Sequence, residues 1–199
     1  NRPLVQTIPP GSTFKLVTSA AALENGYEPD SVLPGPAAYQ LPGSTRQLNN
    51  WSGAPCGAND RTTLANALAI SCNSAFAYLG NELGDDVLRA QAEKFGFATS
   101  FDVPMTAATS RFPEDPDPAQ TAMSAIGQFD VAATSLQMAQ VTASISNNGM
   151  TMYPYLVNQV LAPDLTVLSQ TQPRQFQRAM SEANAAKLMG MMVQVVDSG

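Results

Sequence analysis

The stretch Pro10-Gly11-Ser12-Thr13-Phe14-Lys15 opens the first helical segment of the chain, predicted over 12–24. A spacing of three residues places Ser12 and Lys15 on one face of a helix, within reach of each other. Burial and the positive end of the helix dipole both lower the pKa of an amine, so Lys15 could accept a proton from Ser12. Backbone N–H groups at the helix start could help to hold an oxyanion. The pattern predicts a nucleophilic serine with a lysine base.

So short a pattern also fits a simpler interpretation, in which Ser12 only caps the helix and Lys15 is a surface charge. Against this, the segment follows a Pro-Pro-Gly break and lacks the Glu or Gln of a capping box. A second polar pair, Ser71 and Asn73, lies at a predicted turn between two helices. Taken alone, that pair favours a capped helix junction. The two patterns together favour a catalytic site.

The composition removes several classes of function. The 199 residues contain no histidine, which excludes a Ser-His-Asp triad, a Cys-His pair and a histidine-based zinc site. Two cysteines are too few for a thiolate metal site, so we expect neither a metal nor a cofactor. A net charge of −6 makes nucleic acid a poor partner. No apolar stretch reaches the roughly 18–20 residues that span a bilayer.

The pattern along the chain is mainly helical. Beyond the first helix we predict helices over 63–70, 73–83, 85–95, 134–146 and 181–197, with Asp85, Thr134 and Ser181 at helix starts. Residues 27–61 and 99–118 are rich in Gly, Pro and polar residues and predict long loops, the first with room for a short hairpin. Two strands are predicted over 153–161 and 165–168. We expect a chain that is part of something longer.

Four blocks of sequence carry a resemblance to one family. Pro10 to Lys15 resembles the P-G-S-T-F-K block of class B penicillin-binding proteins, above all of the mycobacterial type. Ala67 to Phe76 resembles the A-L-x-x-S-x-N-x-x-F stretch of that family. Ile126-Gly127-Gln128 and Leu136 to Ala139 resemble its G-Q-G and T-P-L-Q-M-A blocks. The blocks occur in the family's order and span most of the chain.

The chain also departs from the family pattern. Phe129 stands where the family often has Gly, and Ser135 where it often has Pro. No Lys-Thr-Gly or Lys-Ser-Gly triplet occurs, although the family carries one on an edge strand after a helix like that over 181–197. We therefore expect residues 1–199 to be a partial transpeptidase domain, lacking flanking sheet strands and this motif. Such a segment alone is expected to be inactive.

The resemblance implies an α/β fold of the transpeptidase and serine β-lactamase type, a helical subdomain beside a central antiparallel sheet, with mainly the helical part present here. It implies that Ser12 attacks peptidoglycan stem peptides ending in D-Ala-D-Ala and is acylated by β-lactams. Lys15 would be the base, Ser71 would relay a proton, and Asn73 would orient the substrate amide. Division or other cell-wall proteins are expected partners. The resemblance places the domain outside the cytoplasm, with the membrane anchor elsewhere.

Two positions keep alternative interpretations. Gly127 and Gln128 fit a substrate contact and a tight turn about equally well. Cys56 and Cys72 could form a disulfide, which the exported location of the family permits, or remain two buried thiols. The pairing would clamp the loop over 27–61 beside the Ser71 motif.

Other functions are also open. A β-lactam sensor would be acylated without turnover, and a serine β-lactamase would hydrolyse the drug. Glu114 is a candidate deacylating base for the latter, but its Pro- and Asp-rich surroundings favour a solvated turn.

Overall fold

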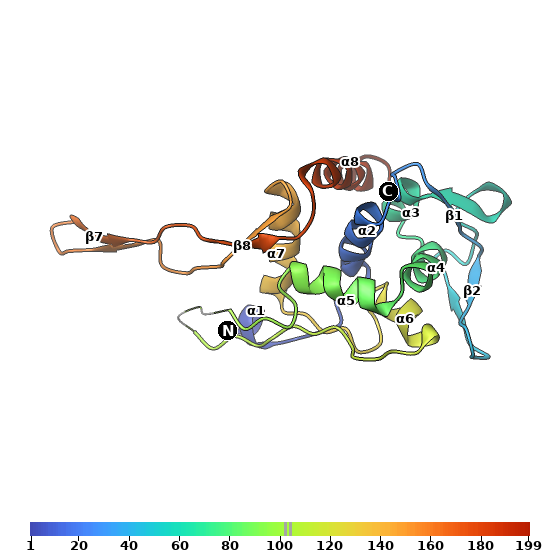
Figure 1. Ribbon diagram of the computed structural model, residues 1–199, viewed down its shortest axis with the longest axis horizontal. Helices are drawn as coiled ribbons and strands as arrows, with labels where there is room; N and C mark the ends of the chain where they lie inside the picture. The colour runs from blue at the N-terminus through green and yellow to red at the C-terminus, as the bar shows by residue number, and fades with distance from the viewer. Residues whose placement is uncertain (102, 104) are drawn as a thin grey trace.

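Helix α2 (Lys15–Glu24) lies at the centre of the molecule, enclosed by other helices (Figure 1). The computed structural model describes residues 1–101, 103 and 105–199. Eight of the ten residues of α2 are buried, and three consecutive alanines, Ala20, Ala21 and Ala22, let neighbouring helices approach closely. Its neighbours are α4 (Asn73–Leu83), α5 (Asp85–Lys94) and α8 (Glu182–Ser198). A side chain at the start of α2 therefore faces protein rather than water.

The first predicted helix is divided into two parts. Residues Gly11–Phe14 form a 3-10 turn, η1, and the α-helix begins only at Lys15. Gly11 has a φ of 57°, a backbone conformation that glycine adopts without strain. Ser12 caps no helix, because its side chain makes no capping hydrogen bond. The tighter turn projects Ser12 outward while Phe14 and Lys15 turn into the core.

The other predicted helices are present with small shifts at their ends. Helix α3 (Leu64–Ala69), α7 (Ser135–Ser146) and α8 begin at Thr63, Thr134 and Ser181, whose hydroxyl oxygens accept backbone N–H groups. The predicted starts at Thr134 and Ser181 are confirmed.

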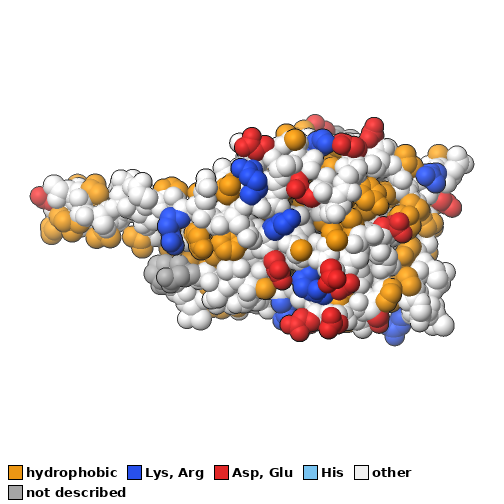
Figure 2. All heavy atoms as spheres, viewed as in Figure 1, with side chains coloured by type: hydrophobic (Ala, Val, Ile, Leu, Met, Phe, Trp, Pro, Cys, Tyr) orange, Lys and Arg blue, Asp and Glu red, His pale blue; other side chains and the backbone are white. Residues whose placement is uncertain are grey.

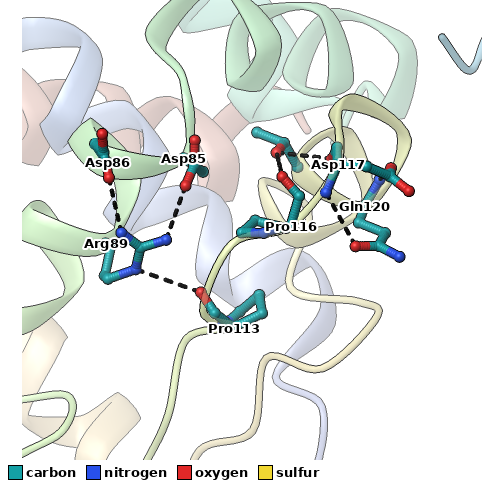
Figure 3. Close-up of polar contacts among 8 residues, drawn as sticks. Asp85, Asp86, Arg89, Pro113, Pro116, Asp117 and Gln120 are labelled. Carbon is teal, nitrogen blue, oxygen red and sulfur yellow. Dashed lines mark hydrogen bonds and ion pairs between the residues drawn. The ribbon is translucent and has the colours of Figure 1, made fainter.

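The prediction that Asp85 caps α5 is wrong. Gly84 occupies the cap at a φ of 84°, and Asp85 is the first helical residue. From there its carboxylate pairs with Arg89, which also binds Asp86 and donates to the Pro113 carbonyl (Figure 3). Arg89 thereby ties the loop after residue 99 to α5.

Two helices were not predicted, α1 (Arg2–Val5) and α6 (Pro118–Ser124). Helix α6 begins with a capping box, in which Asp117 and Gln120 each accept the other's backbone N–H (Figure 3). Proline at the first helical position supports the same start. The signal was present in the sequence but lay inside a stretch dominated by loop residues.

The described strands form four antiparallel pairs rather than one broad sheet. The predicted loop over 27–61 contains three short strands and a 3-10 turn, η2 (Ala58–Asp60). The pairs are β1 (Val32–Pro34) with β4 (Arg61–Thr63), β2 (Ala38–Gln40) with β3 (Gln47–Asn49), β5 (Met150–Met152) with β8 (Gln175–Arg178), and β6 (Gln159–Leu161) with β7 (Val167–Gln170). The strands predicted over 153–161 and 165–168 are thus shorter or shifted, and β5 and β8 were not predicted.

The β6–β7 hairpin projects from the body as an arm (Figure 1). We call residues 155–173 the arm. Apolar side chains are exposed along it, including Leu165 and Leu168, and Asp164 is its one charged residue (Figure 2). The arm contrasts with the helical body, where the charged side chains of this view gather. None of the helices among the described residues is long and apolar enough to cross a bilayer.

Candidate active site

A chain of hydrogen bonds links the two ends of the predicted catalytic motif. Ser71 Oγ donates to Ser12 Oγ at 3.0 Å, and Lys15 Nζ donates to Ser71 Oγ at 2.9 Å. The structure therefore brings Ser12, Lys15 and Ser71 together, as predicted. The route differs from the prediction, however. Among the described contacts, the amine reaches Ser12 through the Ser71 hydroxyl.

Lys15 is fully buried, which contradicts its interpretation as a surface charge. Its ammonium has three acceptors, Ser71 Oγ, the Ser71 carbonyl and Asn73 Oδ1, each within 2.9 Å. Burial lowers the pKa of Lys15 from 10.5 to about 8, so about a tenth of the amine is neutral at pH 7. The predicted direction is confirmed, and the cause is burial. A neutral amine has the lone pair that a general base needs.

The ring of Phe76 lies below the amine, with its centroid 5.4 Å from Lys15 Nζ. Sequence reasoning gave Phe76 no role, although it ends the second family block. An aromatic face attracts a cation without offering a carboxylate, and none of the ion pairs among the described residues involves Lys15. These partners stabilise the ammonium without an opposite charge, so burial outweighs them and the pKa of Lys15 stays below its ordinary value.

Ser71 lies in the left-handed region of backbone space, at a φ of 56°. Its N–H bonds to the Leu68 carbonyl and the Cys72 N–H to the Ala67 carbonyl, a Schellman motif that ends α3. Glycine is the usual residue at this position, and another residue costs on the order of 1–2 kcal/mol there. Ser71 thus places a hydroxyl at a position where glycine would be unstrained. Such backbone strain is common at functional sites.

Asn73 is the first residue of α4, and both the oxygen and the nitrogen of its side-chain amide make hydrogen bonds. Its Oδ1 accepts from Lys15, and its Nδ2 donates to the Asn49 carbonyl at 3.1 Å. One N–H of Nδ2 remains beyond that bond, and the residue is half-buried. The predicted substrate contact through this amide stays a prediction.

Gly127 and Gln128 occupy different environments. Gly127 is buried, and its carbonyl accepts from the Gly11 N–H at 3.0 Å. A Cβ on Gly127 would lie less than 3 Å from Gly11 O and the Phe14 Cβ. The η1 turn can therefore take its observed position only because residue 127 is glycine. Gln128 is exposed. The geometry favours the tight-turn interpretation for Gly127, and it leaves the substrate contact of Gln128 a prediction.

A hollow of about 370 Å³ opens beside Ser12. Its walls come from three helices and are mostly apolar, with Leu16, Leu68 and Met192 among them. Ser12 and Ser71 contribute the hydroxyl groups at its edge. This arrangement suits a ligand that presents a carbonyl to Ser12 and apolar groups to the helices.

Cys56 and Cys72 form a disulfide, with Cα atoms 6.0 Å apart. Cys72 follows Ser71 directly, so the bond fastens the segment between β3 and β4 to the helix junction that carries the site. A crosslink that closes about 15 residues contributes on the order of 3 kcal/mol in the chain-entropy account. The alternative of two free thiols does not apply to this structure.

Glu114 is exposed and joins none of the hydrogen bonds of the Ser12 site. The described part of the chain also contains no group of three or more potential metal ligands from His, Cys, Asp and Glu. The chemistry of the site therefore rests on hydroxyl, amine and amide groups.

The family described as penicillin binding protein transpeptidase domain matches residues 1–199. The chain belongs to this family. The transpeptidase fold and the predicted resemblance to mycobacterial members are confirmed. Phe129, the departure from the family's frequent glycine, has a φ of 61°, which explains why glycine suits that position.

The chain is also similar to named peptidoglycan transpeptidases and penicillin-binding proteins. The chain is 46% identical over 194 residues to the peptidoglycan D,D-transpeptidase PbpA of Mycolicibacterium smegmatis, covering 97% of this chain and 40% of that protein. It is 45% identical to PbpA of Mycobacterium tuberculosis H37Rv, with the same coverage. The penicillin G acyl-enzyme complex of penicillin-binding protein A from M. tuberculosis superimposes with a TM-score of 0.95 at 44% identity, over 99% of this chain and 46% of that one. The chain thus spans about two fifths of the curated relatives' length.

Proposed function

We propose that Ser12 is the nucleophile of a penicillin-sensitive peptidoglycan D,D-transpeptidase. The observation that carries the proposal is the hydrogen-bonded chain from Ser12 through Ser71 to a buried Lys15 whose pKa is about 8. Similarity to PbpA and to a penicillin-binding protein that forms β-lactam acyl-enzymes supports it. The substrates are stem peptides ending in D-Ala-D-Ala, and β-lactams bind covalently.

The proposed first step forms an ester on Ser12. The two hydroxyl groups first rotate, so that Ser12 donates to Ser71 Oγ and Ser71 donates to the neutral Lys15 Nζ. The Ser12 Oγ then attacks the carbonyl of the penultimate D-Ala while its proton passes to Ser71 Oγ, and the Ser71 proton passes to Lys15 Nζ. The amide C–N bond then breaks, and D-Ala leaves as an amine that takes the proton back along the same chain. Backbone N–H groups of the turn that carries Ser12 hold the oxyanion. Asn73 orients the substrate amide.

The second step transfers the acyl group. The primary amine of a second stem peptide attacks the Ser12 ester, an amide bond forms and the C–O bond breaks. The proton that the amine loses returns to Ser12 Oγ through Ser71. In this scheme Lys15 is restored, so no external acid or base is consumed.

We further propose that residues 1–199 are part of a longer domain, completed by sheet strands and a Lys-Thr-Gly motif. The share of the relatives' length that the chain spans supports this. The domain would lie outside the cytoplasm of a membrane-anchored protein, a location with which the Cys56–Cys72 disulfide agrees. Cell-wall or division proteins are proposed partners.

Labelling of the complete protein with a fluorescent penicillin tests the nucleophile. Ser12→Ala is expected to abolish the covalent label, because no other hydroxyl receives the hydrogen bond from Ser71 in this site. Ser19→Ala is the matched control, since it removes a buried α2 hydroxyl without a hydrogen-bond partner among the described residues. Labelling of Ser12→Ala at the wild-type level would refute the assignment.

Turnover separates the proposed enzyme from its two alternatives. The transpeptidase is expected to release D-Ala from a D-Ala-D-Ala peptide and to keep its penicillin label for long periods. A sensor would keep the label without releasing D-Ala, and a β-lactamase would lose it rapidly. Glu114→Gln, which removes the candidate deacylating base, is expected to leave the hydrolysis of the penicillin label unchanged.

A further inference from the structure

Phe129 holds a backbone conformation that its side chain disfavours. Its φ of 61° is rare for a bulky residue, and such conformations cost on the order of 1–3 kcal/mol. Burial of the ring offsets little of this free-energy cost, because the residue is 49% exposed. A strained residue that presents an aromatic ring to solvent gives no obvious benefit to folding. This combination points to recognition of a ligand.

The ring lines a groove of about 420 Å³ on the body of the protein. Other walls are formed by Arg111, Glu114, Gln120 and Asp130, with Phe112 buried among them. Arg111 and Asp130 are paired, yet their side chains are 56% and 54% exposed. The groove therefore offers an aromatic face, a guanidinium and carboxylates that water, or a ligand, can reach.

The groove is coupled to the turn that carries Ser12. Phe112 stacks on Phe14 with ring centroids 5.9 Å apart, and Phe14 ends the η1 turn. On the same side, the Gly11 N–H binds the carbonyl of Gly127, two residues before Phe129. Two independent contacts thus place the groove next to the nucleophile turn. The hollow lined by Leu16, Leu68 and Met192 shares no lining residue with it.

We propose that the Phe129 groove binds the peptide that carries the accepting amine, and that Phe129 determines specificity for it. The inference rests on the proposed transpeptidase function, which needs two peptides at Ser12. A peptide with charged and aliphatic parts fits the groove, since aliphatic carbons pack on an aromatic ring and charged ends pair with Arg111, Glu114 or Asp130. Held there, the peptide presents its primary amine to the acyl group on Ser12.

The reaction in this second half-step balances without a further reactant. The amine nitrogen forms an amide bond with the acyl carbon, and the bond from that carbon to Ser12 Oγ breaks. One proton leaves the nitrogen and returns to Ser12 Oγ. Hydrolysis by water competes at the same ester, so the ratio of aminolysis to hydrolysis reports how well the acceptor is held.

The test uses the complete protein, a thioester analogue of a D-Ala-D-Ala peptide as donor, and two acceptors. Free D-alanine has only a methyl side chain to offer the groove, whereas a tripeptide with a lysine side chain offers aliphatic carbons and charged groups. Phe129→Gly is expected to lower tripeptide aminolysis relative to hydrolysis by about tenfold, the effect of one lost aromatic contact. Aminolysis by D-alanine and acylation by penicillin are expected to stay at wild-type levels.

Two further variants separate recognition from structure. Phe129→Tyr keeps the ring and is expected to behave as wild type, while Glu114→Gln is expected to lower tripeptide aminolysis a few-fold. An unchanged aminolysis ratio in Phe129→Gly would overturn the proposal, as would an equal loss with both acceptors. Absence of penicillin acylation in the wild-type protein would instead refute the proposed function, so the two failures are distinguishable.

Discussion

The Ser12 site and the arm differ in how many contacts their side chains make and in how deeply they are buried. Around Ser12, side chains have several partners each, and Lys15 is fully buried with three acceptors. In the arm, Leu165 is 75% exposed, and among the described strands β6 and β7 pair only with each other (Figure 1). A two-stranded hairpin is marginally stable alone, so the arm contributes little to the fold. The contrast shows that this molecule concentrates its side-chain contacts around Ser12 and not in the arm.

Removal of the base should give the largest effect. Lys15→Met is expected to lower the rate of penicillin acylation by about 10²–10⁴-fold, the range for loss of a general base. The fold should persist, because losing a costly buried amine offsets the acceptors left unpaired. Stopped-flow acylation and urea unfolding measure the two quantities. The control is Lys94→Met, at an exposed lysine, and acylation by Lys15→Met at the wild-type rate would exclude Lys15 as the base.

A pair of variants at Ser71 separates the hydroxyl from the backbone strain. Ser71→Gly and Ser71→Ala are both expected to lower acylation by on the order of 10²-fold, because each removes the link between Ser12 and Lys15. Ser71→Gly should be more stable than Ser71→Ala by about 1 kcal/mol, since only glycine is unstrained at a φ of 56°. Urea unfolding compares them. Equal stability would mean that the left-handed conformation carries no cost.

The pKa of Lys15 predicts how acylation depends on pH. The rate should fall about tenfold per pH unit below pH 8, where the amine becomes protonated, and level off above it. A rate that stays flat from pH 6 to pH 9 would contradict the role of the amine.

Stability should respond to the same titration with a defined sign. The pKa of Lys15 is lower in the folded state than the ordinary 10.5, so protonation opposes folding below about pH 8. The free energy of unfolding should rise by about 3 kcal/mol between pH 8 and 10.5 relative to Lys15→Met. Comparing the two proteins by urea unfolding at each pH cancels the other titrating groups.

A Leu→Ala substitution should lower the free energy of unfolding strongly in the core and very little in the arm, which is the smallest effect predicted. Leu79→Ala in the core, where the side chain is fully buried, is expected to cost about 2–5 kcal/mol. Leu165→Ala in the arm is expected to change stability by less than about 0.5 kcal/mol and to leave acylation unchanged. Urea unfolding of both variants checks this. A cost above 1 kcal/mol for Leu165→Ala would show that the arm is held by the body.

Much of the helical fold could be predicted because its signals are local. The hydroxyl groups of Thr134 and Ser181 mark helix starts, and the motif blocks mark the site. The capping box of Asp117 and Gln120 was an equally local signal, masked by the prolines around it. The strands were harder to predict, because β6 and β7 are exposed on both faces and so lack the alternation that burial on one face creates.

The site could be predicted by residue but not by geometry. Helical spacing pairs Ser12 directly with Lys15, whereas in the structure the two are linked by Ser71, 59 residues after Ser12 in the chain. The Gly11 contact with Gly127, more than a hundred residues away, is equally beyond the reach of local sequence signals. The positive φ values of Ser71 and Phe129 are likewise set by packing, because neither residue type favours them.

Gly127 and Phe129 are separated by a single residue, yet they differ in the variation they can accept. Any side chain at position 127 would collide with Gly11 and displace the nucleophile, so natural variants there should be lost by selection. At position 129 the backbone accepts glycine without strain, and the side chain faces water. Related sequences can therefore diversify at position 129 while retaining the acylation machinery. One short turn thus contains both a position that accepts only glycine and a nearby position that is open to evolutionary change.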